Sequence, residues 1–296
     1  MAQLAAHLVV ALIALVVVGG ATRVMEAGLA CPDWPLCFGT LLPGRQMNIQ
    51  VFLEWFHRLD ALLIGMVLLG QYVFAVMFRA QLPRWLPWTY LLLVALVSLQ
   101  AGLGALTVLH LLPSVVVTAH LVLALTLVAA MSGLTQRLMM PMGLVAPLWW
   151  RLMSFLSLIS VVGQCLLGGR MATTWSAQIC LTHGQSCQLL DLHRNAAISV
   201  ATCIVLLVIT SLSVGGWART QWPLLLVVSL LLASQISLGS LTVHFHLKQP
   251  VLTIAHQLVA ALLVAFLAAL SCRRPKEYSA TLDIISNENH LEHCHG

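Results

Sequence analysis

Residues 51–78 read VFLEWFHRLDALLIGMVLLGQYVFAVMF, an almost unbroken apolar stretch whose charged residues are Glu54, Arg58 and Asp60. A helix needs about 20 mostly apolar residues to cross the hydrocarbon layer of a membrane. Seven further stretches of this kind occur, at residues 5–22, 86–109, 114–136, 148–169, 189–215, 222–243 and 250–271. Their apolar residues run continuously and do not alternate, which predicts helices and not barrel strands. The sequence therefore predicts an all-α integral membrane protein with eight transmembrane helices.

The composition of the whole chain agrees with this fold class. Apolar residues make up 60% of the 296 residues and charged residues only 8%, against about 25% charged residues in an ordinary soluble domain. So few charges exclude a soluble globular protein, and the high apolar content excludes a disordered chain. The net charge of +5 does not indicate nucleic acid, because no basic cluster lies outside the tail. Residues 5–22 lack a basic segment and a cleavage pattern, so we interpret them as a span and not a signal peptide.

An even number of spans puts both chain termini on the same side of the membrane. Eight basic residues fall on the side of the termini and four fall in the opposite loops. The four are Arg23, Arg45, Arg170 and Lys248. Basic residues are enriched in cytoplasmic loops. We therefore expect a multi-pass protein of the cell membrane with both termini in the cytoplasm. The two longer loops, residues 23–50 and 170–188, would then lie outside.

The spacing of four histidines within the spans indicates an internal duplication. His57 and His120 are 63 residues apart, and so are His193 and His256. An arginine follows the first histidine of each pair, as Arg58 and Arg194. We expect two parallel four-helix-bundle repeats, since an even number of spans per repeat preserves direction. The predicted units are an N-terminal half at residues 1–140, a C-terminal half at 141–272, and a polar, disordered tail at 273–296.

The four histidines are all predicted to lie at a similar depth, about 6–10 Å below the outer ends of their helices at 1.5 Å per residue. A single buried histidine is more often a hydrogen-bonded core residue than a ligand. Four at one depth, in two equally spaced pairs, favour metal binding instead. Two facing imidazoles suit a haem iron. Zinc would need further Cys, Asp or Glu ligands, and none recurs beside these histidines in both halves. We therefore predict one haem site in each half.

Two kinds of charged residue accompany the predicted ligands. Arg58 and Arg194 are candidates for binding haem propionates through paired hydrogen bonds, although each could instead extend to the lipid headgroups. Glu54 lies one helical turn before His57, and the equivalent residue of the second half is Leu190. This asymmetry indicates that the first half performs proton chemistry, unless Glu54 forms a salt bridge with a loop arginine or is solvated at the helix start.

Each outer loop contains a pair of cysteines, Cys31 and Cys37 in the first and Cys180 and Cys187 in the second. The outer side of a bacterial membrane is oxidising, so disulfide bonds are expected. Both pairs could serve as structural cross-links. A short, accessible disulfide beside a reactive site could instead be exchangeable and pass electrons.

These residues together resemble the heme A synthase family over residues 5–271. The resemblance depends on GLACPDWPLC at residues 28–37, on Glu54-x-x-His57-Arg58 and on the four histidines. It implies oxidation of a ring methyl of heme O to a formyl group, which gives heme A for terminal oxidases. In this family the reaction is described as two successive hydroxylations followed by loss of water. The second outer loop departs from the pattern, because it has no copy of the CPDWP string.

The resemblance also implies roles for individual residues. His57 and His120 would hold the substrate, heme O, and its product heme A, while His193 and His256 would ligate a resident heme b. Glu54, Cys31 and Cys37 would be the catalytically linked residues, with Cys180 and Cys187 as the family's second cysteine pair. Heme O would be supplied by heme O synthase, and the electron acceptor is not indicated. Membrane lipid is the expected surrounding, and both a single chain and a homo-oligomer are compatible with the sequence.

Two other classes of function fit part of the sequence. A di-haem b-type electron-transfer protein would explain the four histidines but would leave Glu54 without a role. A transporter built from parallel repeats would place broken helices near the midplane of the membrane, whereas the polar residues here cluster near the outer side. Heme A synthase activity is therefore the preferred prediction.

Overall fold

Eight long helices form most of the computed structural model, which describes residues 1–140, 144–185 and 187–275. They are α1 (Ala2–Val24), α2 (Ile49–Met77), α3 (Leu86–Leu109), α4 (Ser114–Met139), α5 (Leu148–Thr173), α7 (Gln188–Val214), α9 (Trp222–His244) and α10 (Pro250–Cys272). All eight are long and apolar enough to cross a membrane, so the predicted spans are confirmed. Three short helices join them: η1 (Gly44–Gln46), α6 (Ser176–His183) and α8 (Gly216–Thr220). Most of the tail predicted to be disordered, residues 276–296, lies outside the described residues.

The ends of the long helices follow from local sequence. The Asn48 side chain accepts hydrogen bonds from the backbone N–H groups of Gln50 and Val51, both at 3.0 Å, and so caps the start of α2. Proline occupies the first turn of α3, α9 and α10, where its missing N–H has no helical partner to lose. After α7, Gly215 adopts a positive φ of 79°, a conformation that glycine reaches without steric cost. These signals explain why the observed boundaries lie within a few residues of the apolar stretches.

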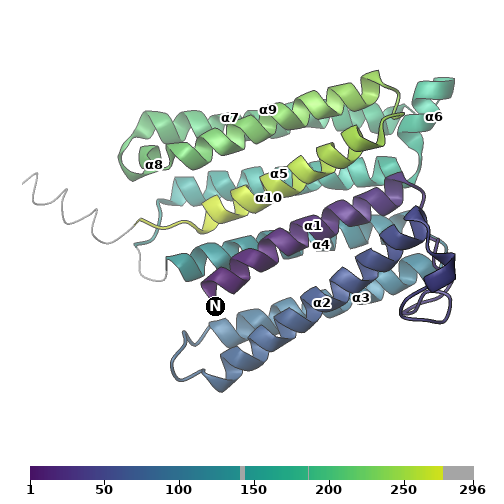
Figure 1. Cartoon of the computed structure of the whole chain (residues 1–296). Helices are drawn as coiled ribbons and strands as arrows, with labels where there is room; N and C mark the ends of the chain where they lie inside the picture. Colours follow the sequence, from purple (N-terminus) through teal and green to yellow (C-terminus); the bar gives the residue numbers. More distant parts are fainter. Residues whose placement is uncertain (141–143, 186, 276–296) are drawn as a thin grey trace, which may run out of the picture.

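The long helices form three groups side by side (Figure 1). Helices α2 and α3 lie at one side, α7 and α9 lie at the other, and α1, α4, α5 and α10 lie between them. Around the first half each helix packs on the next in the order α1, α2, α3, α4, and α4 packs back on α1. The second half has the order α5, α7, α9, α10, and α10 packs back on α5. This common order is the one that parallel repeats require, and the duplication itself stays a prediction.

Hydrogen bonds between helices stabilise the middle group. Ser132 on α4 donates to the carbonyl oxygen of Ala265 on α10 at 2.6 Å. Gln257 on α10 donates to the carbonyl oxygen of Val16 on α1 at 3.1 Å. In an apolar bundle, such polar contacts and small residues replace the hydrophobic effect as the source of helix association. The two halves are therefore joined through α1, α4 and α10.

Large apolar side chains are exposed along the outer faces of the helices. On α2 alone, Leu62, Met66 and Val73 are between 47% and 57% exposed. Such a surface would be unfavourable in water but is suited to lipid tails. Together with the eight apolar helices, this surface indicates a multi-pass membrane protein.

Both cysteine-containing segments lie at the same end of the bundle, which we call the cysteine end (Figure 1). The first is residues 25–48, between α1 and α2. The second is residues 174–187, between α5 and α7, and it contains α6. The sequence did not predict α6, because a helix of eight residues lacks the length that identified the spans.

Candidate functional site

The four predicted ligands lie on four different helices: His57 on α2, His120 on α4, His193 on α7 and His256 on α10. Each of these helices starts at the cysteine end, and each histidine is about 8–12 Å along its helix at 1.5 Å per residue. All four side chains are partly buried. The predicted similarity in depth is thus present in the fold.

In the first half, the rings of His57 and His120 lie close together, with the edge of one ring toward the other. Their centroids are 6.5 Å apart and their planes are inclined by 67°. A metal–nitrogen bond to imidazole is about 2 Å long, and an imidazole nitrogen lies roughly 1.1 Å from the ring centre. Two rings that share one ion would therefore have centroids about 6.3 Å apart. The distance between these rings fits an iron ion held between them.

A glycine on the helix before each histidine contacts its ring. A methyl group added to Gly19 on α1 would lie 2.9 Å from Cε1 of His57. The corresponding distances to Cε1 of His120, His193 and His256 are 3.3, 3.2 and 3.0 Å, from Gly104, Gly168 and Gly239 respectively. Any larger residue would displace the rings or strain the packing. The sequence analysis missed these contacts, although glycines recurring in apolar spans are a signal that could have found them.

Two of these glycines belong to doublets that also reach the other half. A methyl group on Gly20 would overlap the side-chain amide of Gln257, the residue after His256. A methyl group on Gly169 would lie 2.8 Å from Cδ2 of Leu121, the residue after His120. Each doublet therefore contacts a histidine ring of its own half and the helix that carries a histidine of the other half.

The donor set fits haem better than other metals. The Nδ1 atoms of His57, His120 and His256 are buried and have no hydrogen-bond partner. Within the described ranges, no group of three or more His, Cys, Asp or Glu side chains could hold a metal ion. Structural zinc is almost always bound by four ligands, whereas a six-coordinate haem iron needs only two imidazoles from the protein. The residues present at both histidine pairs therefore suit haem.

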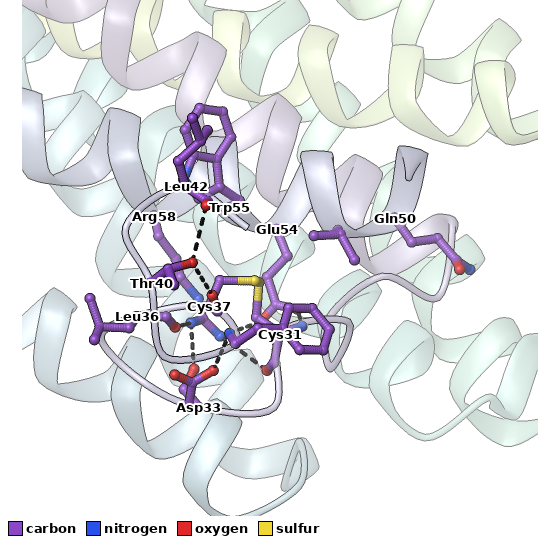
Figure 2. Close-up of a disulfide and its surroundings, with 12 residues drawn as sticks. Cys31, Asp33, Leu36, Cys37, Thr40, Leu42, Gln50, Glu54, Trp55 and Arg58 are labelled. Atoms are coloured by element: carbon purple, nitrogen blue, oxygen red, sulfur yellow. Dashed lines mark hydrogen bonds and ion pairs between the residues drawn. A yellow bond between two sulfur atoms is a disulfide. The ribbon is translucent and has the colours of Figure 1, made fainter. Parts of the chain in front are cut away.

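Glu54 is one helical turn from His57 and is only 4% exposed. Its Oε2 accepts a hydrogen bond from the backbone N–H of Cys31 at 2.8 Å. Its Oε1 forms a salt bridge with Nη2 of Arg58 at 2.5 Å. The alternative that Glu54 forms a salt bridge is thus present, with a partner on its own helix instead of in the loop. Burial with these two contacts holds the carboxylate against the first cysteine-containing segment (Figure 2).

Arg58 contacts the first cysteine-containing segment with most of its donors. Its Nη1 donates to the carbonyl oxygens of Asp33 and Leu36, both at 2.6 Å, and its Nη2 lies 3.5 Å from the carbonyl oxygen of Cys31. Figure 2 shows this guanidinium group inside the curve of the loop. Arg194, by contrast, is exposed. The predicted contact of either arginine with a haem propionate stays a prediction.

The Cys31–Cys37 disulfide bond is present and lies beside Glu54 (Figure 2). Its cysteines are 0% and 2% exposed, and Ala30, Val51 and Trp55 pack against them. The idea of an accessible disulfide is therefore wrong for this pair. The sequence could not reveal the burial, because it depends on α2 packing over a loop that precedes it.

The Asp33 side chain fixes a turn in the middle of this segment. Its carboxylate accepts hydrogen bonds from the N–H groups of Phe38 at 2.6 Å and Gly39 at 2.8 Å. Phe38 and Gly39 both have positive φ. The hydrogen bond from Gly39, with those from Phe38 and the charge of Arg58, holds the pKa of Asp33 below its usual value. Asp33 therefore stabilises the turn more strongly when it is ionised.

The corresponding region of the second half is different. The Cys180–Cys187 disulfide bond joins α6 to the residue that precedes α7, and both of its cysteines are partly exposed. Leu190, which lies three residues before His193 as Glu54 lies three residues before His57, is 3% exposed. The nearest acid, Asp191, is exposed. The buried acid of the first half thus has an apolar counterpart here.

Comparison with known proteins identifies the family of this chain. The chain is 29% identical over 191 residues to the heme A synthase of Shewanella oneidensis, a match that covers 56% of this chain and 55% of that protein. It is 33% identical over 209 residues to the heme A synthase of Bradyrhizobium diazoefficiens, covering 56% and 58% respectively. The matched region thus spans little more than half the length of these relatives. The model of the COX15-CtaA family, described as cytochrome oxidase assembly protein, matches residues 2–268. With nearly all of its length matched, this chain belongs to the COX15-CtaA family.

Proposed function

We propose that this protein is a heme A synthase that oxidises a ring methyl of heme O to a formyl group. The observation that carries the proposal is the pair of His57 and His120 rings, 6.5 Å apart, one helical turn from the buried carboxylate of Glu54. The similarity to two proteins named heme A synthase supports it. A site for electron transfer alone would need the two rings but not the acid.

The proposed division of labour follows the two halves. His57 and His120, in the unit at residues 1–140, hold heme O as substrate and heme A as product. His193 and His256, in the unit at residues 141–272, hold a heme b, which supplies one-electron redox chemistry when bound. The support for this division is the acid, which is present as Glu54 in the first half and replaced by Leu190 in the second.

Glu54 is the proposed acceptor for protons that leave the oxidised methyl group. Both of its carboxylate oxygens already accept hydrogen bonds, from Cys31 and Arg58. A proton arriving at Oε1 would weaken the charge-assisted bond to Arg58. Because Arg58 also holds the carbonyl oxygens of Asp33 and Leu36, proton uptake at Glu54 is coupled to the first cysteine-containing segment. Cys31 and Cys37 are included in the proposed site for this reason.

The two arginines have different proposed roles. Arg58 positions Glu54 and the loop, and a propionate could reach it only by displacing some of these contacts. Arg194 is exposed beside His193, so its five donors are available for a propionate of the resident haem. Both termini are proposed to be cytoplasmic, which places the cysteine end outside. Heme O synthase is the proposed source of the substrate.

An electron-transfer protein with two b haems is the second candidate, favoured by the equal placement of the two histidine pairs. Mass analysis of haems extracted from the purified protein separates the two functions. The protein is expressed with and without a heme O synthase in a host that lacks heme A. With heme O supplied, we expect a haem that has gained one oxygen and lost two hydrogens. Finding only heme b and unmodified heme O would overturn the proposed synthase and leave the electron carrier.

A further inference from the structure

A groove with a volume of about 510 Å³ lies between α3, α4 and α5. It is lined by residues of α4 from Val115 to Thr126, by Leu99 of α3 and by Leu166 of α5. Val115, Leu99 and Leu166 are 65%, 56% and 45% exposed, so the groove faces the surrounding lipid. From Val115 to Thr126 the groove extends about 16 Å at 1.5 Å per residue. This length is about half of the hydrocarbon thickness of a membrane, and it suits an acyl chain of one leaflet.

Arg170 lies at one end of this groove. It is a half-buried residue of the groove lining, three residues before the end of α5 at the cysteine end. Its Nη1 donates to Oγ of Ser114 at 2.8 Å, and among the described residues it has no acidic partner, since their one ion pair joins Arg58 to Glu54. A guanidinium group carries five donors. Most of the donors and the whole charge of Arg170 are therefore left for a partner outside the protein.

The start of α4 adds further donors at the same end of the groove. Ser114 is the first residue of α4, and the side chain of Pro113 before it forms no cap. The free N–H groups in the first turn of a helix carry partial positive charge and favour an anion. The Ser114 hydroxyl accepts its hydrogen bond from Arg170, which leaves its own proton for another acceptor. An apolar groove thus ends at an uncompensated cation and a hydroxyl group.

The arginine near the end of α1 is different, because the protein itself supplies its partners. Nη2 of Arg23 donates to the carbonyl oxygen of Ala172 at 2.8 Å. Its guanidinium carbon also lies 3.9 Å from the centre of the Trp175 ring, a favourable cation–π distance. Neither kind of contact is present for Arg170 in the described part of the chain. A cation at a helix end therefore need not stay unpaired in this fold.

We propose that the groove binds one acyl chain of an anionic phospholipid from the leaflet at the cysteine end, with the lipid phosphate on Arg170 and Ser114. A guanidinium group binds phosphate through two parallel hydrogen bonds. A zwitterionic phospholipid has the same phosphate but carries its own cation, so it compensates the charge of Arg170 less well. The bound lipid contacts α3 and α4 of the first half and α5 of the second, and it stabilises the seam between them.

Binding of two lipids with the same acyl chains tests the proposal. The purified full-length protein is stripped of lipid in detergent and titrated with phosphatidylglycerol or phosphatidylcholine, and bound lipid is counted by native mass spectrometry. We expect one phosphatidylglycerol to bind about tenfold more tightly than phosphatidylcholine, since hydrogen bonds to charged groups are among the stronger ones. Arg170→Gln should abolish this preference, whereas Arg170→Lys, which keeps the charge, should retain most of it. Arg45→Gln is the control, because Arg45 is exposed at the same end of the bundle and outside the groove.

A second substitution tests the apolar part of the groove independently of Arg170. Ala119→Phe fills the groove and should weaken binding of both lipids about tenfold. Ala101→Phe, at an exposed residue of α3 outside the groove, should leave both affinities unchanged.

Three outcomes would overturn the proposal. They are an unaltered preference in Arg170→Gln, an equal loss of preference in Arg45→Gln, and unaltered affinities in Ala119→Phe. Neither lipid takes part in haem oxidation, so failure of the lipid site would leave the proposed function as it stands.

Discussion

The two cysteine-containing segments occupy equivalent places at the same end of the bundle, yet only the first is built around a buried charge. In residues 25–48 the disulfide is fully covered and Arg58 connects three backbone carbonyl groups to Glu54. In residues 174–187 the disulfide is partly exposed, and the position of Glu54 is taken by Leu190. The second segment has the cross-link of the first without its polar network.

Because both segments contain a disulfide, the disulfide alone does not distinguish them. What distinguishes the first segment is that a backbone N–H of a bridged cysteine, that of Cys31, is a hydrogen-bond donor to the buried acid. A movement of the disulfide would therefore shift a hydrogen-bond donor of Glu54 directly, with no other side chain between them. The second segment has no comparable connection to its histidines among the described residues.

Removing the acid of Glu54 should have the largest effect of the changes that test this difference between the two halves. Glu54→Gln keeps the size of the side chain but removes its ability to take up a proton, and it leaves one acceptor oxygen where the carboxylate has two. General acid–base groups typically contribute about 10²–10⁴-fold to rate, so heme A formation should fall at least about 100-fold with haem still bound. Chromatography of extracted haems measures this. Asp191→Asn, the exposed acid of the second half, is the control, and equal loss in both variants would contradict a special role for the first half.

Arg58→Met should undock the first segment. Breaking a buried ion pair by removing one partner costs about 3–5 kcal/mol, and at the lower end this corresponds to roughly a 100-fold change in an equilibrium. We expect the Cys31–Cys37 bond to be reduced by a phosphine about 100-fold faster, as followed by thiol alkylation and mass spectrometry. Arg194→Met removes the exposed arginine of the second half and should leave the rate for both disulfides unchanged. An unaltered Cys31–Cys37 rate in Arg58→Met would show that the contacts in Figure 2 do not hold the loop.

In the unmodified protein the two disulfides should differ in reactivity. Reduction requires access to sulfur, which burial denies to Cys31 and Cys37 but not to Cys180 and Cys187. Under the same phosphine treatment, we expect the second bond to be reduced about tenfold faster or more. One proteolytic digest reports the alkylated thiols of both disulfides, so each disulfide serves as the reference for the other. Equal rates would mean that the first segment opens freely in solution.

Acid should weaken the first segment selectively, and this is the smallest expected effect. The pKa of Asp33 is lower in the folded loop than in an unfolded chain, so its stabilising contribution is complete above the unfolded value of about 4. The contribution is lost as the pH falls through the folded pKa. Reduction of Cys31–Cys37 relative to Cys180–Cys187 should therefore rise a few-fold below about pH 4, and Asp33→Asn should flatten this dependence. If the reduction rate of Cys31–Cys37 rises equally in Asp33→Asn, Asp33 is excluded as the cause of the pH dependence.

The sequence predicted those features that depend on continuous composition or on regular spacing. All eight spans were predicted within a few residues, because each is an apolar stretch interrupted by polar loops. The similar depth of the four histidines followed from helix rise alone. The contacts of Arg58 with Asp33 and Leu36 were not predictable, because they depend on the path of a loop that precedes α2. The glycine contacts with the imidazoles were missed for a similar reason, since only the crossing of two helices brings Gly168 to His193.

The glycine doublets have a consequence for how closely the two halves pack on one another. Gly19 contacts His57, and the adjacent Gly20 contacts the residue that follows His256. Two adjacent residues of α1 therefore contact the His57 ring on one side and the helix that carries His256 on the other. The crossing of α1 and α10 therefore helps to set where the helices that carry His57 and His256 lie relative to one another. A side chain introduced at Gly20 would displace the amide of Gln257 and break its hydrogen bond to the carbonyl oxygen of Val16, which joins the two halves.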